Sequence, residues 1–281
     1  MMSIFVLIWG LVSVLLGYEF WALHSHLDKS LLHFLQKSGW LNSTFELTSA
    51  PGRPYSLWLG WIGLGAMILM NAYSLRKRSS LMSGWGGLQK WLNFHVFCGL
   101  IGPTFILFHC DFKVRGLVAI SFWSMMVSFS SGIIGRYLYV NLLRGKAELG
   151  AHERSILKVL DEHLLRAKVE ANAGEREKYL ASARRLAGLP EQAEAAGTIS
   201  AFFSSLIGSV RMMFKDAEIS PRWPPTAKII LNEYAVNRRK ISYYGPFQTL
   251  MGHWHTFHFP FAVFMYVAAA FHVAAAMIFG I

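Results

Sequence analysis

Four histidines recur at one spacing in two apolar stretches of the chain. His95 and His109 are 14 residues apart, and so are His258 and His272. In an α-helix, 14 residues turn through about 1400°, about 40° short of four full turns, so each pair shares a face and spans roughly 21 Å along the axis. Imidazole nitrogens bind metals, and ionisable side chains are costly inside a bilayer. These positions are therefore candidates for a function.

If the two helices run in the same direction, the histidines meet as two level pairs. His95 then faces His258 near one side of a hydrocarbon core of about 30 Å, and His109 faces His272 near the other. Two imidazole nitrogens can serve as the axial ligands of one haem iron. A single intramembrane histidine can equally be a packing residue, but four at matched depths favour two bis-histidine haem b groups. His255 is expected to point elsewhere, because 17 residues leave it about 100° out of register with His272.

The elements that must hold these histidines are membrane helices. The chain is 54% hydrophobic and 15% charged, whereas soluble domains carry about 25% charged residues. The sequence predicts an all-α membrane protein with five spans in a haem-binding helix bundle, at about 3–23, 56–73, 88–109, 117–140 and 252–279. The first stretch has no basic start and no clear cleavage site, so we expect a retained anchor and not a signal peptide.

The distribution of Lys and Arg predicts the orientation. The loop at 74–87 is basic, and the 110 residues of 141–250 hold 17 Lys and Arg. The positive-inside rule therefore places the N-terminus and 141–250 in the cytoplasm and the C-terminus outside. It also makes the third and fifth spans parallel, as the histidine pairs require. The predicted organisation is 1–140 with four spans and an outer amphipathic segment at 24–54, 141–250 as a cytoplasmic insert, and 251–281 as the last span.

The insert differs in composition from the spans. Residues 145–197 carry Glu, Lys, Arg, Ala and Leu at helical spacing, and "NAG" at 172–174 predicts the turn of a helical hairpin. The segment 199–214 is a short apolar helix that could lie at the membrane interface or under a partner subunit. "SPRWPPTAKII" at 220–230 is expected to be a Pro-rich connector. The insert has no nucleotide, flavin or iron–sulfur signature, and nucleic-acid binding is not expected.

Four further residues are candidates for the haem environment. Gly102 lies seven residues from both His95 and His109 and could leave room for a flat macrocycle. Arg136, Lys113 and Arg115 lie near span ends and could pair with haem propionates, although interfacial anchoring is an equal alternative. His24 and His26 could suggest a metal site, but no other ligands accompany them. Residues 27–41 are expected to form a surface helix.

The two-helix pattern His-x13-His resembles that of the di-haem membrane cytochromes b. It is shared by the cytochrome b/b6 and cytochrome b561 groups and by ferric reductase-like membrane domains. "WHTFHFPF" followed by "AAFHVAAA" is similar to bacterial cytochrome b-type subunits with a Trp-His-x-x-His-x-Pro entry. The resemblance is clearest over 88–140 and 250–280, and the long insert before the last helix departs from it.

The resemblance implies a subunit in a bacterial inner membrane that carries electrons within a larger oxidoreductase. Its partners would be quinone or redox subunits, such as an iron–sulfur, flavin or multihaem cytochrome c protein. One alternative is a ferric reductase-like enzyme that acts at its own haems. Another is a non-redox anchor or transporter. The sequence assigns no catalytic residue and no quinone pocket.

Overall fold

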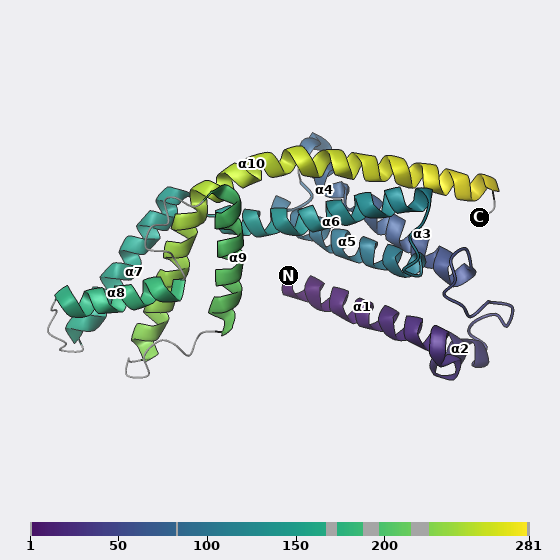
Figure 1. Cartoon of the computed structure of the whole chain (residues 1–281), viewed down its shortest axis with the longest axis horizontal. Helices are drawn as coiled ribbons and strands as arrows, with labels where there is room; N and C mark the ends of the chain where they lie inside the picture. Colours follow the sequence, from purple (N-terminus) through teal and green to yellow (C-terminus); the bar gives the residue numbers. More distant parts are fainter. Residues whose placement is uncertain (1, 83, 167–172, 188–196, 215–224, 280–281) are drawn as a thin grey trace. The chain divides into compact units, whose positions relative to one another are not determined.

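The computed structural model describes residues 2–82, 84–166, 173–187, 197–214 and 225–279, and these ranges contain helices and no strand (Figure 1). Five helices are long and apolar enough to cross a membrane. The all-α part of the prediction is therefore confirmed for the described residues, and the five long apolar helices suggest a multi-pass membrane protein. The five are α1 (Met2–Ser25), α3 (Pro54–Leu69) with its continuation α4 (Ala72–Arg78), α5 (Leu88–His109), α6 (Leu117–Leu142) and α10 (Pro225–Phe279).

The chain forms two compact units. The first comprises Met1–Ile133 and His258–Ile281, and the second comprises Ile134–Phe257. The predicted insert, 141–250, falls within the second unit. Both α6 and α10 contribute residues to each unit.

In the first unit, small residues let α3 and α5 pack closely. A Cβ on Gly102 would lie 2.7 Å from Cγ of Met67, and one on Gly63 would lie 2.9 Å from the Ile106 side chain. Close approach of backbones at small residues is a common way for membrane helices to associate. These small residues allow an extensive contact between α3 and α5.

Helix α1 also lies against α5 and exposes its other side. Trp9 donates from Nε1 to Thr104 Oγ1 (3.0 Å), and the rings of Phe5 and Phe97 stack with centroids 4.8 Å apart. Large apolar side chains of α1 are nevertheless exposed, with Leu7 at 71%. Such a surface suits a lipid environment and not water.

A methionine cluster joins α3, α6 and α10 within the first unit. Met67, Met125 and Met265 are each buried to less than 5% exposure. Beside them, Tyr266 donates its hydroxyl proton to the Met67 carbonyl and accepts a hydrogen bond from Asn71 Nδ2 (2.7 Å). These contacts fix the C-terminal part of α10 to α3.

The segment after α1 contains two short helices, η1 (Leu27–Lys29) and α2 (Leu31–Lys37). The buried carboxylate of Glu19 accepts hydrogen bonds from Ser30 Oγ (2.5 Å) and from the backbone N–H groups of Leu31 and Leu32. A carboxylate at this position satisfies backbone donors that the first turn of a helix leaves unpaired. The single helix expected over 27–41 is thus replaced by two short helices that end at Lys37. Short helices α4 and η2 (Ser80–Met82) precede α5.

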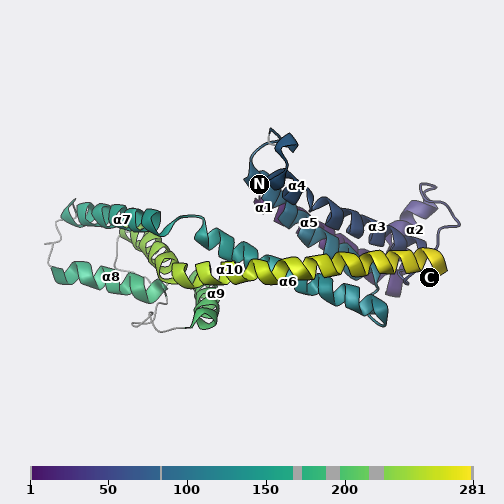
Figure 2. The same cartoon turned by 90° about the horizontal axis from the view of Figure 1, so that it is seen from above.

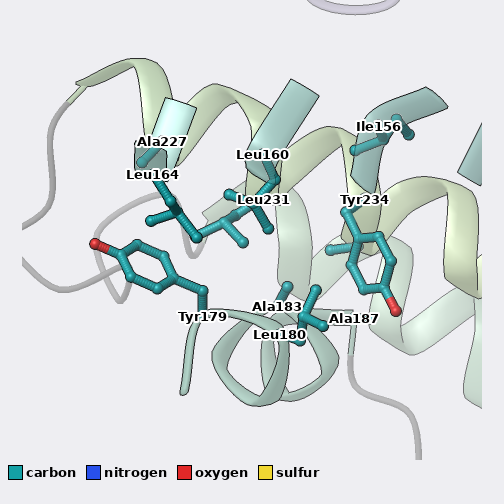
Figure 3. Packing of buried hydrophobic residues seen from close by; sticks show 11 residues of the cluster. Ile156, Leu160, Leu164, Tyr179, Leu180, Ala183, Ala187, Ala227, Leu231 and Tyr234 are labelled. Carbon is teal, nitrogen blue, oxygen red and sulfur yellow. The ribbon is translucent and has the colours of Figure 1, made fainter. Parts of the chain in front are cut away.

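One core of the second unit is formed by the predicted hairpin together with the N-terminal part of α10. Helices α7 (Lys146–Arg166) and α8 (Ala173–Ala187) lie side by side (Figure 2) and are linked by a hydrogen bond from Arg176 Nε to Asp161 Oδ1 (2.8 Å). This bond raises the pKa of the Arg176 guanidinium. Their apolar faces pack on α10 in a core that Figure 3 shows: Ile156, Leu160, Leu164, Tyr179, Leu180, Ala183, Ala187, Ala227, Leu231, Tyr234 and Ala235. Of the turn predicted at 172–174, residue 172 lies outside the described residues, whereas Ala173 and Gly174 are the first residues of α8.

Helix α10 begins within the predicted connector, at Pro225, and runs for 55 residues. Proline is compatible with the first helical turn, where its missing N–H has no intrahelical partner. Ala227, Leu231, Tyr234 and Ala235 then recur at helical spacing and bury one face against α7 and α8. The rest of the connector, up to residue 224, lies outside the described residues.

Helix α9 (Thr198–Phe214) completes the second unit and packs on the end of α6 and on α10. The hydroxyl groups of Tyr137 and Ser205 are hydrogen-bonded (2.9 Å), and Arg239 Nη2 donates to Ser209 Oγ (2.8 Å). A small residue also brings α6 and α10 together, because a Cβ on Gly135 would collide with the Trp254 ring.

Candidate functional site

The structure brings His109 and His272 together at one cavity. The cavity has a volume of about 400 Å³ and lies in the first unit between α3, α5, α6 and α10. Its walls are mostly apolar and include Leu57, Trp61, Leu64, Phe122, Val273 and Met277. Two imidazoles in an apolar cavity of this size are suited to binding a flat cofactor.

Helix α3 fixes the orientation of the His109 ring. Nδ1 of His109 lies 2.7 Å from the Ser56 carbonyl oxygen, and Ser56 Oγ donates to the His109 carbonyl (2.8 Å). Gly60 makes room for the ring, because a Cβ there would lie 2.8 Å from His109 Nδ1. Since a carbonyl can only accept, His109 carries its proton on Nδ1, and the lone pair is on Nε2.

His95, the other candidate ligand on α5, is held in a similar way. Its Nδ1 lies 2.9 Å from the carbonyl oxygen of Met70, which follows the last residue of α3. The ring of Tyr73 lies beside it, with centroids 5.6 Å apart. The Nε2 lone pair of His95 is therefore also the one available to a ligand. Metal-binding histidines typically donate their other ring N–H to a carbonyl or carboxylate.

His258 has its neighbours on α6. Its Nδ1 lies 2.6 Å from Ser131 Oγ, and its Cε1 would be 3.8 Å from a Cβ on Gly132. His95 contacts the end of α3 instead. The structure thus places the outer predicted pair at one cavity, and gives His95 and His258 of the inner pair different neighbours. His255 lies beside Trp254, with ring centroids 6.4 Å apart.

Gly102 packs against α3, and its open side faces Met67 and Gly63. The structure therefore gives Gly102 a role in helix packing, and its proposed role beside a macrocycle stays a prediction. Arg136 belongs to the second unit, where its guanidinium lies 5.8 Å from the Tyr139 ring centroid. Its Nη1 is buried and has no hydrogen-bond partner among the residues that the structure describes.

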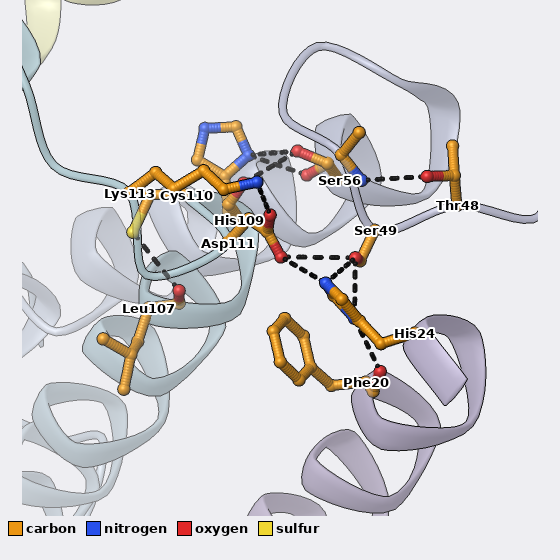
Figure 4. A network of polar contacts seen from close by, with 11 residues as sticks. Phe20, His24, Thr48, Ser49, Ser56, Leu107, His109, Cys110, Asp111 and Lys113 are labelled. Carbon is orange, nitrogen blue, oxygen red and sulfur yellow. Dashed lines mark hydrogen bonds and ion pairs between the residues drawn. The ribbon is translucent and has the colours of Figure 1, made fainter. Parts of the chain in front are cut away.

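The loop that follows His109 is stabilised by the buried carboxylate of Asp111 (Figure 4). Asp111 binds the ammonium of Lys113 (2.6 Å), and its other oxygen lies 3.3 Å from both Ser49 Oγ and His24 Nε2. Asp111 and Phe112 both have positive φ angles, 53° and 57°. Left-handed backbone at non-glycine residues costs free energy, so the contacts of Asp111 must hold this reversal in place.

This network contains two of the sequence candidates, Lys113 and His24. The Lys113 ammonium is already paired with Asp111, so a propionate would have to compete with that carboxylate. Arg115 is exposed in the same loop. His24 contacts Asp111 and Ser49 at the end of α1. Within the described ranges, no group of three or more His, Cys, Asp or Glu side chains could hold a metal ion.

The sequence reasoning missed the residues of α3 that position His109. Ser56 is fully buried, and together with Gly60 and Gly63 it forms a stripe of small residues that faces α5. Their spacing of four and three residues was a visible signal of close helix packing. The contact of His95 with the Met70 carbonyl could not be predicted from the sequence, because every residue has a backbone carbonyl whatever its side chain.

Comparison with known proteins finds no matching family model, and no curated protein or solved structure matches the chain.

Proposed function

We propose that this chain is a di-haem b-type cytochrome subunit that carries electrons across a membrane. His109 and His272 would hold one haem, and His95 and His258 the other. The observation that carries the proposal is the apolar cavity shared by His109 and His272. These two residues, 163 positions apart in the sequence, both line this cavity.

The hydrogen bonds of the α5 histidines support the same proposal. Both His95 and His109 direct Nδ1 at a backbone carbonyl associated with α3. This fixes the tautomer with Nε2 unprotonated, which is the form that binds iron. A histidine that served only in packing would not need the same tautomer at both levels.

A relay role follows from the ligand set. Haem supplies one-electron chemistry, and the protein supplies axial ligands, spacing and an apolar surrounding. With two histidines on each iron, no axial position remains for oxygen or a substrate. The two ligand levels on α5 are about 21 Å apart, a large part of the hydrocarbon thickness of about 30 Å.

Electrons must then enter and leave through other molecules. The sequence has no nucleotide-binding signature, so a quinol or a redox partner subunit is the proposed donor or acceptor. An iron–sulfur, flavin or multihaem cytochrome c protein would suit this role. The charge distribution supports a bacterial inner membrane protein, with its N-terminus and 141–250 in the cytoplasm and its C-terminus outside.

The test is reduction of the purified chain, followed by its absorption spectrum. We expect b-type bands on reduction with dithionite or a quinol analogue, and negligible oxidation of NADH or NADPH. Absence of b-type bands would point to a non-redox anchor. Rapid NADH-driven reduction of ferric iron by the single chain would instead favour a ferric reductase-like enzyme.

A further inference from the structure

Helix α9 has its apolar side chains on the outside. Its exposed hydrophobic residues recur at a helical spacing and form one stripe: Ile199, Phe203, Leu206, Ile207 and Val210. Ile199 and Ile207 are 68% and 66% exposed. A contiguous apolar stripe of this kind is rare on a surface that faces water and marks an interaction site.

The opposite face of α9 is small and polar, and it is buried. Ala201 and Ser205 are 2% and 3% exposed, and Gly208 lies against the Arg239 guanidinium, which a Cβ would approach to 3.1 Å. Ser209 accepts a hydrogen bond from the same guanidinium. The amphipathic pattern of α9 is thus reversed relative to a helix of a soluble domain, which buries its apolar face.

The position of α9 at the end of α6 indicates what covers the apolar stripe. It contacts Tyr137 and Leu138, within the last turns of α6, which ends at Leu142. Helix α6 is long and apolar enough to cross a membrane, so its end marks the boundary between lipid and water. Figure 1 shows α9 running across these last turns of α6. Aromatic residues typical of that boundary surround the contact: Tyr137, Phe202, Tyr243, Phe247 and Trp254.

We propose that α9 is an interfacial helix whose stripe of Ile199, Phe203, Leu206, Ile207 and Val210 is inserted among the lipids of the membrane that α6 crosses. Amphipathic helices of this type bury their apolar face at the boundary of headgroups and acyl chains. Arg144 and Lys146 are exposed just beyond the end of α6, where anionic headgroups attract basic side chains. Interfacial binding would anchor the second unit to the membrane surface, whether or not haem is bound.

Photocrosslinking from lipid tests the placement of α9. The full-length chain is reconstituted into phosphatidylcholine and phosphatidylglycerol vesicles that contain a phosphatidylcholine with a diazirine on its acyl chain. The same lipid is also added to membranes isolated from the producing cell. We expect adducts on residues 199–210 in both preparations. The exposed apolar residues Val159 and Leu165 of α7 serve as an internal control and should give only background.

A matched pair of variants makes the test specific to the stripe. Ile207→Glu should lower the adduct yield on α9 at least threefold, because a carboxylate is excluded from the acyl-chain region. Ser204→Glu, on an exposed position beside the stripe, should leave the yield within twofold of wild type. The proposal would be overturned if the lipid formed adducts on the membrane-spanning helices but not on α9. Labelling in vesicles only would also overturn it, because a protein would then cover the stripe in the cell membrane.

Discussion

The His109 imidazole is positioned by α3, a helix that contributes no ligand. The Ser56 carbonyl fixes its tautomer, and the bare Cα of Gly60 leaves space for its ring. Such outer partners orient a metal ligand as effectively as its own helix does, and their loss typically costs 10- to 100-fold in metal affinity or activity. The proposed site therefore depends on Gly60, which lines the cavity and leaves space for the His109 ring.

We predict that Gly60→Ala disturbs the outer haem. The added Cβ would lie 2.8 Å from His109 Nδ1 and 2.9 Å from Cε1, so the ring must move. Overpacking of this kind costs about 1–3 kcal/mol. We expect loss of the outer haem or a shift in its midpoint potential, measured by a spectroscopic redox titration.

Gly65→Ala is the matched control on the same helix. Among the described residues, no atom outside the backbone of α3 itself lies within 4 Å of a Cβ built at Gly65, so this variant should titrate like wild type. Equal titration curves for the Gly60 and Gly65 variants would contradict the assigned role of Gly60.

At the scale of elements, α10 has two different environments along its length. Its N-terminal part packs in the three-helix core with α7 and α8, and its C-terminal part carries His258 and His272 in the first unit. The core formed with α7 and α8 and the candidate ligands His258 and His272 therefore belong to one continuous helix. Burial of leucine and tyrosine side chains contributes about 1.5–3 kcal/mol per large apolar residue, which makes this core the main source of stability for α7 and α8.

We predict that Leu231→Ala destabilises the second unit by about 2–5 kcal/mol, the usual cost of removing a buried leucine side chain. Leu231 is 1% exposed in the three-helix core. Ile229→Ala, two residues away and 68% exposed, should change stability by less than about 0.5 kcal/mol. The difference in stability between the two variants is measured by limited proteolysis of α7 and α8 at increasing temperature. Similar cleavage of the two variants would show that the hairpin folds without α10.

The elements were largely predictable from sequence, because hydropathy and periodicity depend on side chains alone. The spans at 88–109 and 117–140 match α5 and α6 to within two residues. The N-terminal half of α10 was missed because Pro224 and Pro225 suggested a connector, although a proline can begin a helix. The meeting of His109 with His272 followed from spacing, whereas the carbonyl acceptors and the Asp111 network depend on tertiary contacts that no local pattern encodes.

At the scale of the whole molecule, the basic residues predict which compartment each part faces. Reporter fusions within 146–166 should behave as cytoplasmic, and fusions after Ile281 should behave as exported. The measurement is a paired alkaline phosphatase and fluorescent-protein assay at each position. An exported α7 would reverse the compartment that each proposed haem faces. The pairing of histidines would be unaffected, because it depends only on α5 and α10 being parallel.

The proposal of a di-haem cytochrome is tested most directly by counting the haems and identifying the histidines that hold them. A pyridine haemochrome assay of the purified chain measures this directly. We predict two haem b per polypeptide in the wild type, one in His272→Ala, and two in His255→Ala, because His255 lies out of register with the ligand face. One haem or none in the wild type would contradict the account, and so would loss of a haem from His255→Ala with retention in His272→Ala.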